Sequence, residues 1–294
     1  MEHIPTPEQL VQARPEARNP QFVATGGFKA VFKATLGQKV EAVKVVYIPP
    51  VAREDSSRDE IAGRVKREIE ALRLCKSNRL VKLGNLELQA FSINQRDYLI
   101  YSEEFLEGET LKARIARGHR PDSAEVRLLA RCLMQGLSEL ERIGHIHRDV
   151  KPGNILALAE AERPFVLLDL GIAFKLHGTE LTVRGGGPPG TLLYMAPELF
   201  RPNYKEALDI RSDIYSAGVT LFEYAALQHP LARRGEDIGT TVYRILRQAP
   251  PKLASLRSDL PERLCNGIDR CMKKMPALRY RNPLSFLSEL EGMT

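Results

Sequence analysis

The chain has 294 residues, of which 43% are hydrophobic and 27% charged, a globular composition with room for one large domain or two modest lobes. The formal net charge of +6 comes from basic residues scattered among acidic ones, so we do not expect nucleic-acid binding. No apolar run is long enough to cross a bilayer and the N-terminus lacks the features of a secretory signal, so we expect a cytoplasmic protein without direct membrane insertion.

The first third of the chain is expected to be rich in strands. Residues 1–20 contain four prolines and are expected to form an extension outside the main core. From 21 to 47, Val and Phe alternate around two glycines, as is typical of strands. Residues 49–60 are polar and predict a loop, and apolar residues at helical spacing predict a helix over 60–75.

The predicted secondary structure of the remaining chain changes from strands to helices at Gly108. Strand-like runs at 80–91 and 97–102 precede it, while long helices are expected at 122–143 and near 209–227 beyond it. The sequence therefore predicts an α+β protein with a β-rich first part and an α-rich second part.

The strongest chemical signal is the segment 147–156, which contains Asp149, Lys151 and Asn154. Phosphoryl transfer needs a carboxylate that receives the proton of the attacking hydroxyl, a cation for the transferring group and an oxygen ligand for Mg²⁺. Twenty residues later an apolar strand ends at Asp169, which is followed by Leu170 and a turn-forming glycine. A fixed carboxylate of this kind suits Mg²⁺, and we expect Asn154 and Asp169 to be the metal ligands.

These segments resemble the catalytic loop and metal-binding segment of the Hanks-type, eukaryotic-like protein kinases, in the form found in serine/threonine and bacterial members. The resemblance implies a bilobal kinase fold, with residues 1–20 as an extension, 21–106 as the nucleotide-binding lobe and 107–294 as the catalytic lobe. It implies transfer of the γ-phosphate of ATP, with Mg²⁺ or Mn²⁺, to a serine or threonine hydroxyl of a protein. Asp149 and Lys151 would be catalytic residues.

The expected glycine-rich loop is the weakest match. Of the three glycines in the family pattern only Gly26 is kept, because Ala24 and Lys29 stand at the other two positions; Gly27 adds a second adjacent glycine. This departure leaves nucleotide affinity open. The resemblance implies nucleotide contacts from both lobes, at Val23, Gly26, Gly27, Val31, Ala42, Lys44, Glu104, Leu106 and Leu156.

Lys44 lies in an apolar strand and is expected to be catalytic, bound to the nucleotide phosphates and to a helix glutamate. Glu68 is favoured over Glu70, because Leu72 one turn later would face inward with it. The hinge alignment puts Glu103 at the back of the nucleotide pocket, where a charged residue is unusual and needs a partner or water. A one-residue shift of this alignment is the alternative.

Residues 190–198 resemble the end of a kinase activation segment. The resemblance implies that Thr191 bonds the catalytic loop, that Glu198 pairs with Arg279, and that Asp213 braces the loop's backbone.

In the family that the chain resembles, an arginine before the catalytic aspartate often pairs with a phosphorylated residue of the activation segment. Arg148 stands at that position, so the resemblance implies autophosphorylation at Thr179 or, preferably, Thr182. Because we see no attached sensor domain, we expect regulation through a partner, the N-terminal extension or self-phosphorylation. A nucleotide-binding pseudokinase and a small-molecule phosphotransferase remain the alternatives, and the sequence does not predict an oligomeric state.

Overall fold

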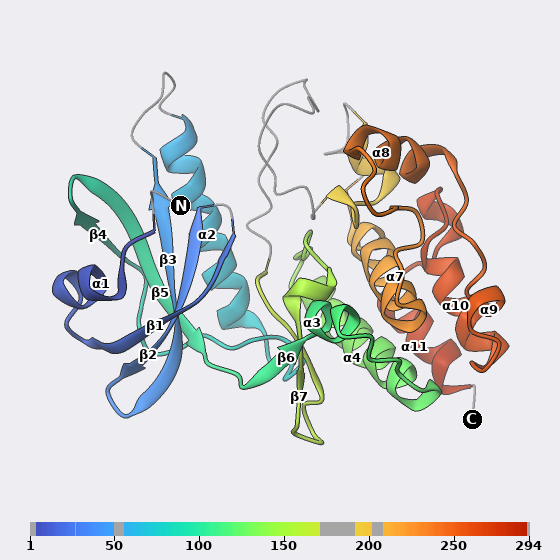
Figure 1. Cartoon of the computed structure of the whole chain (residues 1–294), viewed down its shortest axis with the longest axis horizontal. Coiled ribbons are helices and arrows are strands. Elements are labelled where there is room, and N and C mark those ends of the chain that lie inside the picture. Colours follow the sequence, from blue (N-terminus) through green and yellow to red (C-terminus); the bar gives the residue numbers. More distant parts are fainter. Residues whose placement is uncertain (1–3, 27, 50–55, 171–191, 202–207, 293–294) are drawn as a thin grey trace. The chain divides into compact units, whose positions relative to one another are not determined.

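The computed structural model describes residues 4–26, 28–49, 56–170, 192–201 and 208–292 (Figure 1). The chain divides into two compact units. The first comprises Met1–Leu74 and Val81–Glu107, and the second Cys75–Leu80 and Gly108–Thr294. Among the described residues, no helix is both long and apolar enough to cross a membrane.

The first unit is built on a five-stranded antiparallel sheet in the order β1-β2-β3-β5-β4. Its strands are β1 (Ala17–Gly26), β2 (Lys29–Leu36), β3 (Lys39–Ile48), β4 (Gln89–Ile93) and β5 (Arg96–Glu104). Lys44 on β3 lies opposite Tyr101 on β5, and Ala42 lies opposite Glu103. Directly opposed residues point to the same side, so these four side chains share one face of the sheet.

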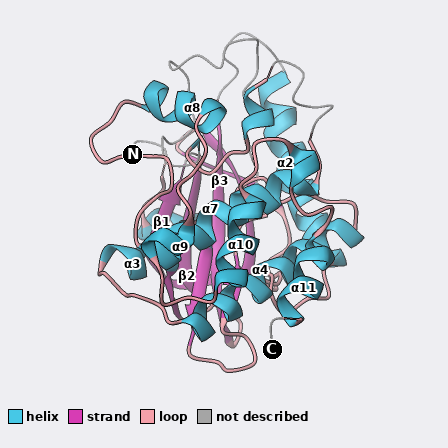
Figure 2. Ribbon diagram, turned by 90° about the vertical axis from the view of Figure 1, so that its right-hand side faces the viewer, coloured by secondary structure: helices cyan, strands magenta, loops and turns pink. Residues whose placement is uncertain are grey.

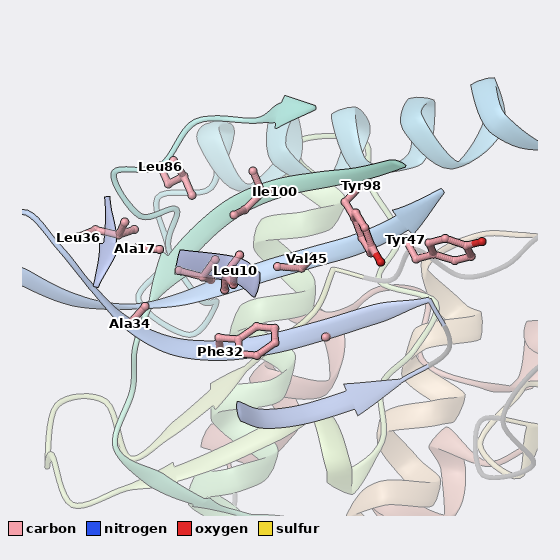
Figure 3. Close-up of a cluster of buried hydrophobic side chains, with 12 residues drawn as sticks. Leu10, Ala17, Phe32, Ala34, Leu36, Val45, Tyr47, Leu86, Tyr98 and Ile100 are labelled. Atoms are coloured by element: carbon pink, nitrogen blue, oxygen red, sulfur yellow. The ribbon is translucent and has the colours of Figure 1, made fainter. Parts of the chain in front are cut away.

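The other face carries a buried apolar cluster, shown in Figure 3, that includes Phe32, Val45 and Ile100. The short helix α1 (Pro7–Ala13) inserts Leu10 into this cluster, and Leu10 is fully buried. Thr6 caps the helix through a reciprocal capping box with Gln9. The prediction that the first twenty residues lie outside the main core is therefore wrong, because an amphipathic turn within the Pro-rich segment covers apolar sheet surface.

Helix α2 (Ser56–Leu74) begins inside the predicted loop 49–60, so this loop is shorter than expected. The four apolar residues that predicted the helix are all buried: Ile61, Val65, Ile69 and Leu72. The predicted strand over 80–91 is largely wrong, since β4 starts only at Gln89. Instead, the backbone of 82–86 hydrogen-bonds the end of β5 without forming a regular strand.

The second unit is mostly helical, and Figure 2 contrasts its cyan helices with the magenta strands of the first. A small sheet in the order β6-β7-β8 supports the segment 147–154. Its strands are β6 (Gly108–Thr110), β7 (Ile155–Leu158) and β8 (Phe165–Leu167). The α-helices among the unit's described residues are α3 (Leu111–Ala116), α4 (Ser123–Arg142), α7 (Ile210–Ala226), α8 (Ile238–Arg247), α9 (Leu253–Leu256), α10 (Glu262–Cys271) and α11 (Pro283–Glu291).

Helix α7 is buried along nearly its whole length and packs against α4 and α10. Gly218 permits this packing, because a Cβ added there would lie 2.6 Å from the Cβ of Cys271. The two long helices predicted at 122–143 and near 209–227 are confirmed as α4 and α7.

Candidate functional site

The segment 147–154 is held in place by the first turn of α7. Asp213 accepts hydrogen bonds from the backbone N–H groups of His147, at 2.6 Å, and Arg148, at 2.8 Å. Burial raises the pKa of Asp213 to about 7, against the lowering effect of these two bonds. Arg148 takes up a left-handed backbone conformation with φ of 68°, which the two bonds help to fix. The prediction that Asp213 braces this loop is confirmed.

His147 connects the loop to the end of β8, a role that the sequence did not reveal. Its buried ring lies with Nε2 3.0 Å from the carbonyl oxygen of Leu168, while Nδ1 accepts the backbone N–H of Asp149 at 3.3 Å. Burial lowers the pKa of His147 to about 4. The ring is thus neutral at pH 7, with a proton on Nε2 to donate and a lone pair on Nδ1 to accept.

The three residues predicted for phosphoryl transfer lie together. The ammonium of Lys151 is 2.7 and 2.8 Å from the two carboxylate oxygens of Asp149. The amide nitrogen of Asn154 donates to one of these oxygens at 2.8 Å and to the Asp149 backbone carbonyl at 2.9 Å. The Asp149 side chain is still one-fifth exposed, so its carboxylate is held in a fixed orientation yet can be reached from solvent.

The residues predicted to hold a metal ion are also near one another within this unit. The backbone N–H of Leu168 donates to the carbonyl of Asn154 at 2.8 Å, which fixes the residue just before Asp169 against the loop. Asp169 has a left-handed φ of 52°. The amide nitrogen of Asn154 donates to Asp149, so the amide oxygen of Asn154 is the atom that can coordinate a cation. This oxygen and a carboxylate are the hard ligands that suit Mg²⁺.

A buried ion pair fixes the segment that follows residue 191. Arg279 donates two hydrogen bonds to Glu198, at 2.6 and 2.7 Å, and both side chains are almost completely buried. The predicted pairing of Glu198 with Arg279 is confirmed. Ser212 on α7 adds a third bond to Glu198 at 2.9 Å, which ties this segment to the same helix that braces the segment 147–154.

In the first unit, Lys44 has a partner that the sequence analysis did not assign to it. Its ammonium lies 2.8 Å from a carboxylate oxygen of Glu103, and both side chains are at least 95% buried. This pairing supplies the partner that a charged residue at position 103 requires. Glu68 is buried and Glu70 exposed, as predicted from the helix geometry. Carboxylate oxygens of Glu68 and Glu103 lie within 4.8 Å of each other, so Glu68 belongs to the same cluster.

The other predicted nucleotide contacts lie on strands and at strand ends. Val31 is opposite Lys44 in the sheet and therefore shares a face with Lys44 and Ala42. Glu104 bonds the Lys82 backbone through both its own backbone N–H and its carboxylate, at 2.9 Å each, and this fixes the end of β5.

The remaining predicted residues divide into those the structure describes and those it does not. Val23 and Gly26 are exposed on β1, Leu106 is partly buried beyond β5, and Leu156 is partly buried on β7. Four predicted residues lie outside the described residues: Gly27, Thr179, Thr182 and Thr191.

Comparison with known proteins gives consistent results. The family model described as protein kinase domain matches residues 19–283. The chain is 27% identical over 289 residues to the serine/threonine-protein kinase PknL of Mycobacterium tuberculosis, covering 97% of this chain and 65% of PknL. It is 27% identical over 281 residues to a probable serine/threonine-protein kinase PknB of Bifidobacterium longum, covering 92% of this chain and 38% of that protein.

The chain thus spans less than two thirds of the length of these curated relatives. Among solved structures, the PknI kinase domain of M. tuberculosis matches with a TM-score of 0.64 at 20% identity, covering 92% of this chain and 93% of that one. This likeness confirms the predicted kinase fold, a β-rich first unit and a helical second unit. With the family model matching nearly the whole chain, the protein belongs to the protein kinase family.

Proposed function

We propose that the chain is a serine/threonine protein kinase that transfers the γ-phosphate of ATP to a hydroxyl of a protein substrate in the cytoplasm. The observation that carries this proposal is the joint hydrogen bonding of Asp149, Lys151 and Asn154. The printed names of PknL and PknB, both serine/threonine kinases, support the choice of acceptor.

In this mechanism Asp149 orients the acceptor hydroxyl and takes its proton as the oxygen attacks phosphorus. The ammonium of Lys151, which lies 2.7 Å from the Asp149 carboxylate, transfers its hydrogen bonds to the phosphoryl group as negative charge develops there. Asn154 and Asp169 would hold Mg²⁺, or Mn²⁺, which when bound neutralises phosphate charge.

Most of the remaining nucleotide contacts in this proposal come from the first unit, and Leu156 adds one from the second. Lys44 binds the α- and β-phosphates, and Glu68 supports it from α2. The adenine edge is bonded by the backbone of Glu104 and Leu106. The faces of the adenine are contacted by Val23, Val31, Ala42 and Leu156. The two glycines Gly26 and Gly27 allow backbone N–H groups to approach the phosphates.

Replacing Asp149 with Asn tests the mechanism. Asn keeps the shape of the side chain but is a very poor base, so we expect phosphate transfer from labelled ATP to a generic protein substrate to fall at least about 100-fold. The exposed Glu160→Gln variant removes one carboxylate from the same unit and should retain activity.

Full activity of Asp149→Asn would contradict the mechanism. Binding of Mg·ATP without any turnover by the unaltered protein would instead support the pseudokinase alternative.

We further propose that the protein phosphorylates its own activation segment, at Thr182 in preference to Thr179. Arg148, next to the catalytic aspartate, is the cation expected to pair with that phosphate. Mass spectrometry of the protein incubated with Mg·ATP should show the modified peptide, and the Asp149→Asn protein should lack it. An unmodified peptide in an active enzyme would contradict this proposal.

A further inference from the structure

The contact between Lys44 and Glu103 lies within the five-stranded sheet of the first unit. Lys44 is on β3 and Glu103 on β5, and the strand register places Glu103 diagonally opposite Lys44 on the same face. Their 2.8 Å contact is therefore set by strand pairing and does not depend on the position of α2.

The cluster around this contact holds more carboxyl groups than the lysine alone can neutralise. Glu68 and Glu103 contribute two carboxyl groups with oxygens within 4.8 Å of each other, and Lys44 contributes one ammonium. The second carboxylate oxygen of Glu103 is buried and accepts no hydrogen bond from the described residues. A buried carboxylate in this condition attracts a cation strongly, and the ammonium of Lys44 lies 2.8 Å from the other oxygen of Glu103.

We propose that Glu103 competes with the phosphates of the nucleotide for Lys44, and so weakens the binding of ATP and ADP relative to adenosine. This inference rests on the proposed function, in which Lys44 binds the α- and β-phosphates. Glu103 is then a specificity-determining residue, because its charge sets how much binding energy the phosphate chain contributes.

The direction of the effect follows from charge. A phosphate that approaches Lys44 must share an ammonium already bonded to Glu103, and it must also approach the negative charge of that carboxylate. Neutralising Glu103 without changing its shape removes both costs. At an effective dielectric constant of about 20, a unit charge as far as about 12 Å away already changes affinity about tenfold, so tenfold is the lower bound of the expected effect.

Calorimetric titration of the protein with Mg·ATP, Mg·ADP and adenosine tests this inference. For Glu103→Gln we expect Mg·ATP and Mg·ADP to bind at least about tenfold more tightly and adenosine to bind as before, since adenosine has no phosphate for Lys44. Glu103→Met, which is neutral and of similar volume, should show the same selective gain and serves if the Gln variant fails to fold.

Glu41→Gln is the matched control. Glu41 is a buried glutamate on the same strand as Lys44, but it points to the opposite face, where it accepts hydrogen bonds from Ser102 at 2.6 Å and Asn85 at 2.9 Å. This variant should lose stability without changing the ratio of ADP affinity to adenosine affinity.

An unchanged or smaller ratio of ADP to adenosine affinity in both Glu103 variants would overturn the inference. So would an equal gain for all three ligands, because that would indicate a change at the adenine side. The proposed function fails separately: a protein that binds Mg·ADP with the expected Glu103 dependence but transfers no phosphate contradicts the kinase proposal and leaves the inference standing.

Discussion

Two buried ion pairs, one in each unit, differ in how completely their hydrogen bonds are satisfied. In the second unit, Arg279 uses all five of its N–H donors: two to Glu198 and three to the backbone carbonyls of residues 211, 273 and 274. Glu198 receives a further bond from Ser212. Each N–H group of Arg279 and each carboxylate oxygen of Glu198 therefore has a hydrogen-bond partner within the protein.

In the first unit, the pair of Lys44 and Glu103 is built differently. One oxygen of Glu103 contacts the lysine, and the other is buried with no hydrogen-bond donor among the described residues. A saturated pair has nothing left to offer a ligand and serves the fold, whereas an unsaturated pair can exchange partners when a charged ligand arrives. The comparison therefore separates a structural ion pair from one suited to function.

The largest expected effect tests the structural pair. Arg279→Met leaves the Glu198 carboxylate buried without its main partner, so we expect the free energy of unfolding to fall by about 3–5 kcal/mol. Lys44→Met removes a partner that contacts one oxygen of Glu103 rather than both, so we expect a smaller loss of about 1–2 kcal/mol. Urea unfolding of both variants at pH 7 measures the difference.

Equal losses in the two variants would contradict the distinction between the pairs. A loss larger for Lys44→Met than for Arg279→Met would reverse it, and would assign the main structural role to the first unit's pair.

The second prediction concerns how each unit covers its apolar surface. Helix α7 is buried along nearly its whole length, while the short helix α1 covers part of one face of the first unit's sheet. Leu10→Ala should lower the free energy of unfolding by about 2–4 kcal/mol, because it removes a fully buried side chain from the cluster. The neighbouring Val11 is 37% exposed, so Val11→Ala should cost less than about 1 kcal/mol.

Similar, small losses for the two variants would show that α1 contributes little to the stability of the sheet. Residues 7–13 precede the region that the family model matches. A large loss for Leu10→Ala would therefore show that a segment outside that region stabilises the first unit's sheet.

The parts of the molecule that the sequence predicted best are those where local pattern and chemistry agree. The long helices α4 and α7 follow from apolar spacing, and the contacts of Asp149 with Lys151 and Asn154 follow from a motif whose residues are close in the chain. The pairing of Glu198 with Arg279 was predicted through the family resemblance, although 81 residues separate them.

The errors share a different cause: they depend on contacts between distant segments. A seven-residue helix in a proline-rich segment gives little periodicity, and only the apolar face of the sheet makes Leu10 a core residue. The pairing of Lys44 with Glu103 depends on the register of two strands more than fifty residues apart, which no local pattern encodes. The roles of His147 and of residues 82–86 also emerge only from tertiary hydrogen bonds.

The smallest predicted effect is a pH dependence that arises from a partly buried histidine in the second unit, His229. Nδ1 of His229 accepts the backbone N–H groups of Leu231, at 3.1 Å, and Ala232, at 2.7 Å, while Nε2 lies 3.1 Å from the carbonyl oxygen of Leu193. A proton on Nδ1 would displace both donors, and burial lowers the pKa of His229 to about 4.

Since the unfolded chain binds this proton at a higher pH than the folded protein does, stability is lost as pH falls from about 6.5 towards 4. We expect His229 to account for a loss of about 2 kcal/mol between pH 7 and pH 4.5. As pH falls over this range, the raised pKa of Asp213 adds stability and the lowered pKa of His147 removes it, so their contributions to the free energy of unfolding largely offset each other. Urea unfolding of the unaltered protein and of His229→Gln, measured over this pH range, therefore isolates the contribution of His229. If the free energy of unfolding changed with pH equally in both proteins, the ring would be protonated in the folded protein as readily as in the unfolded chain.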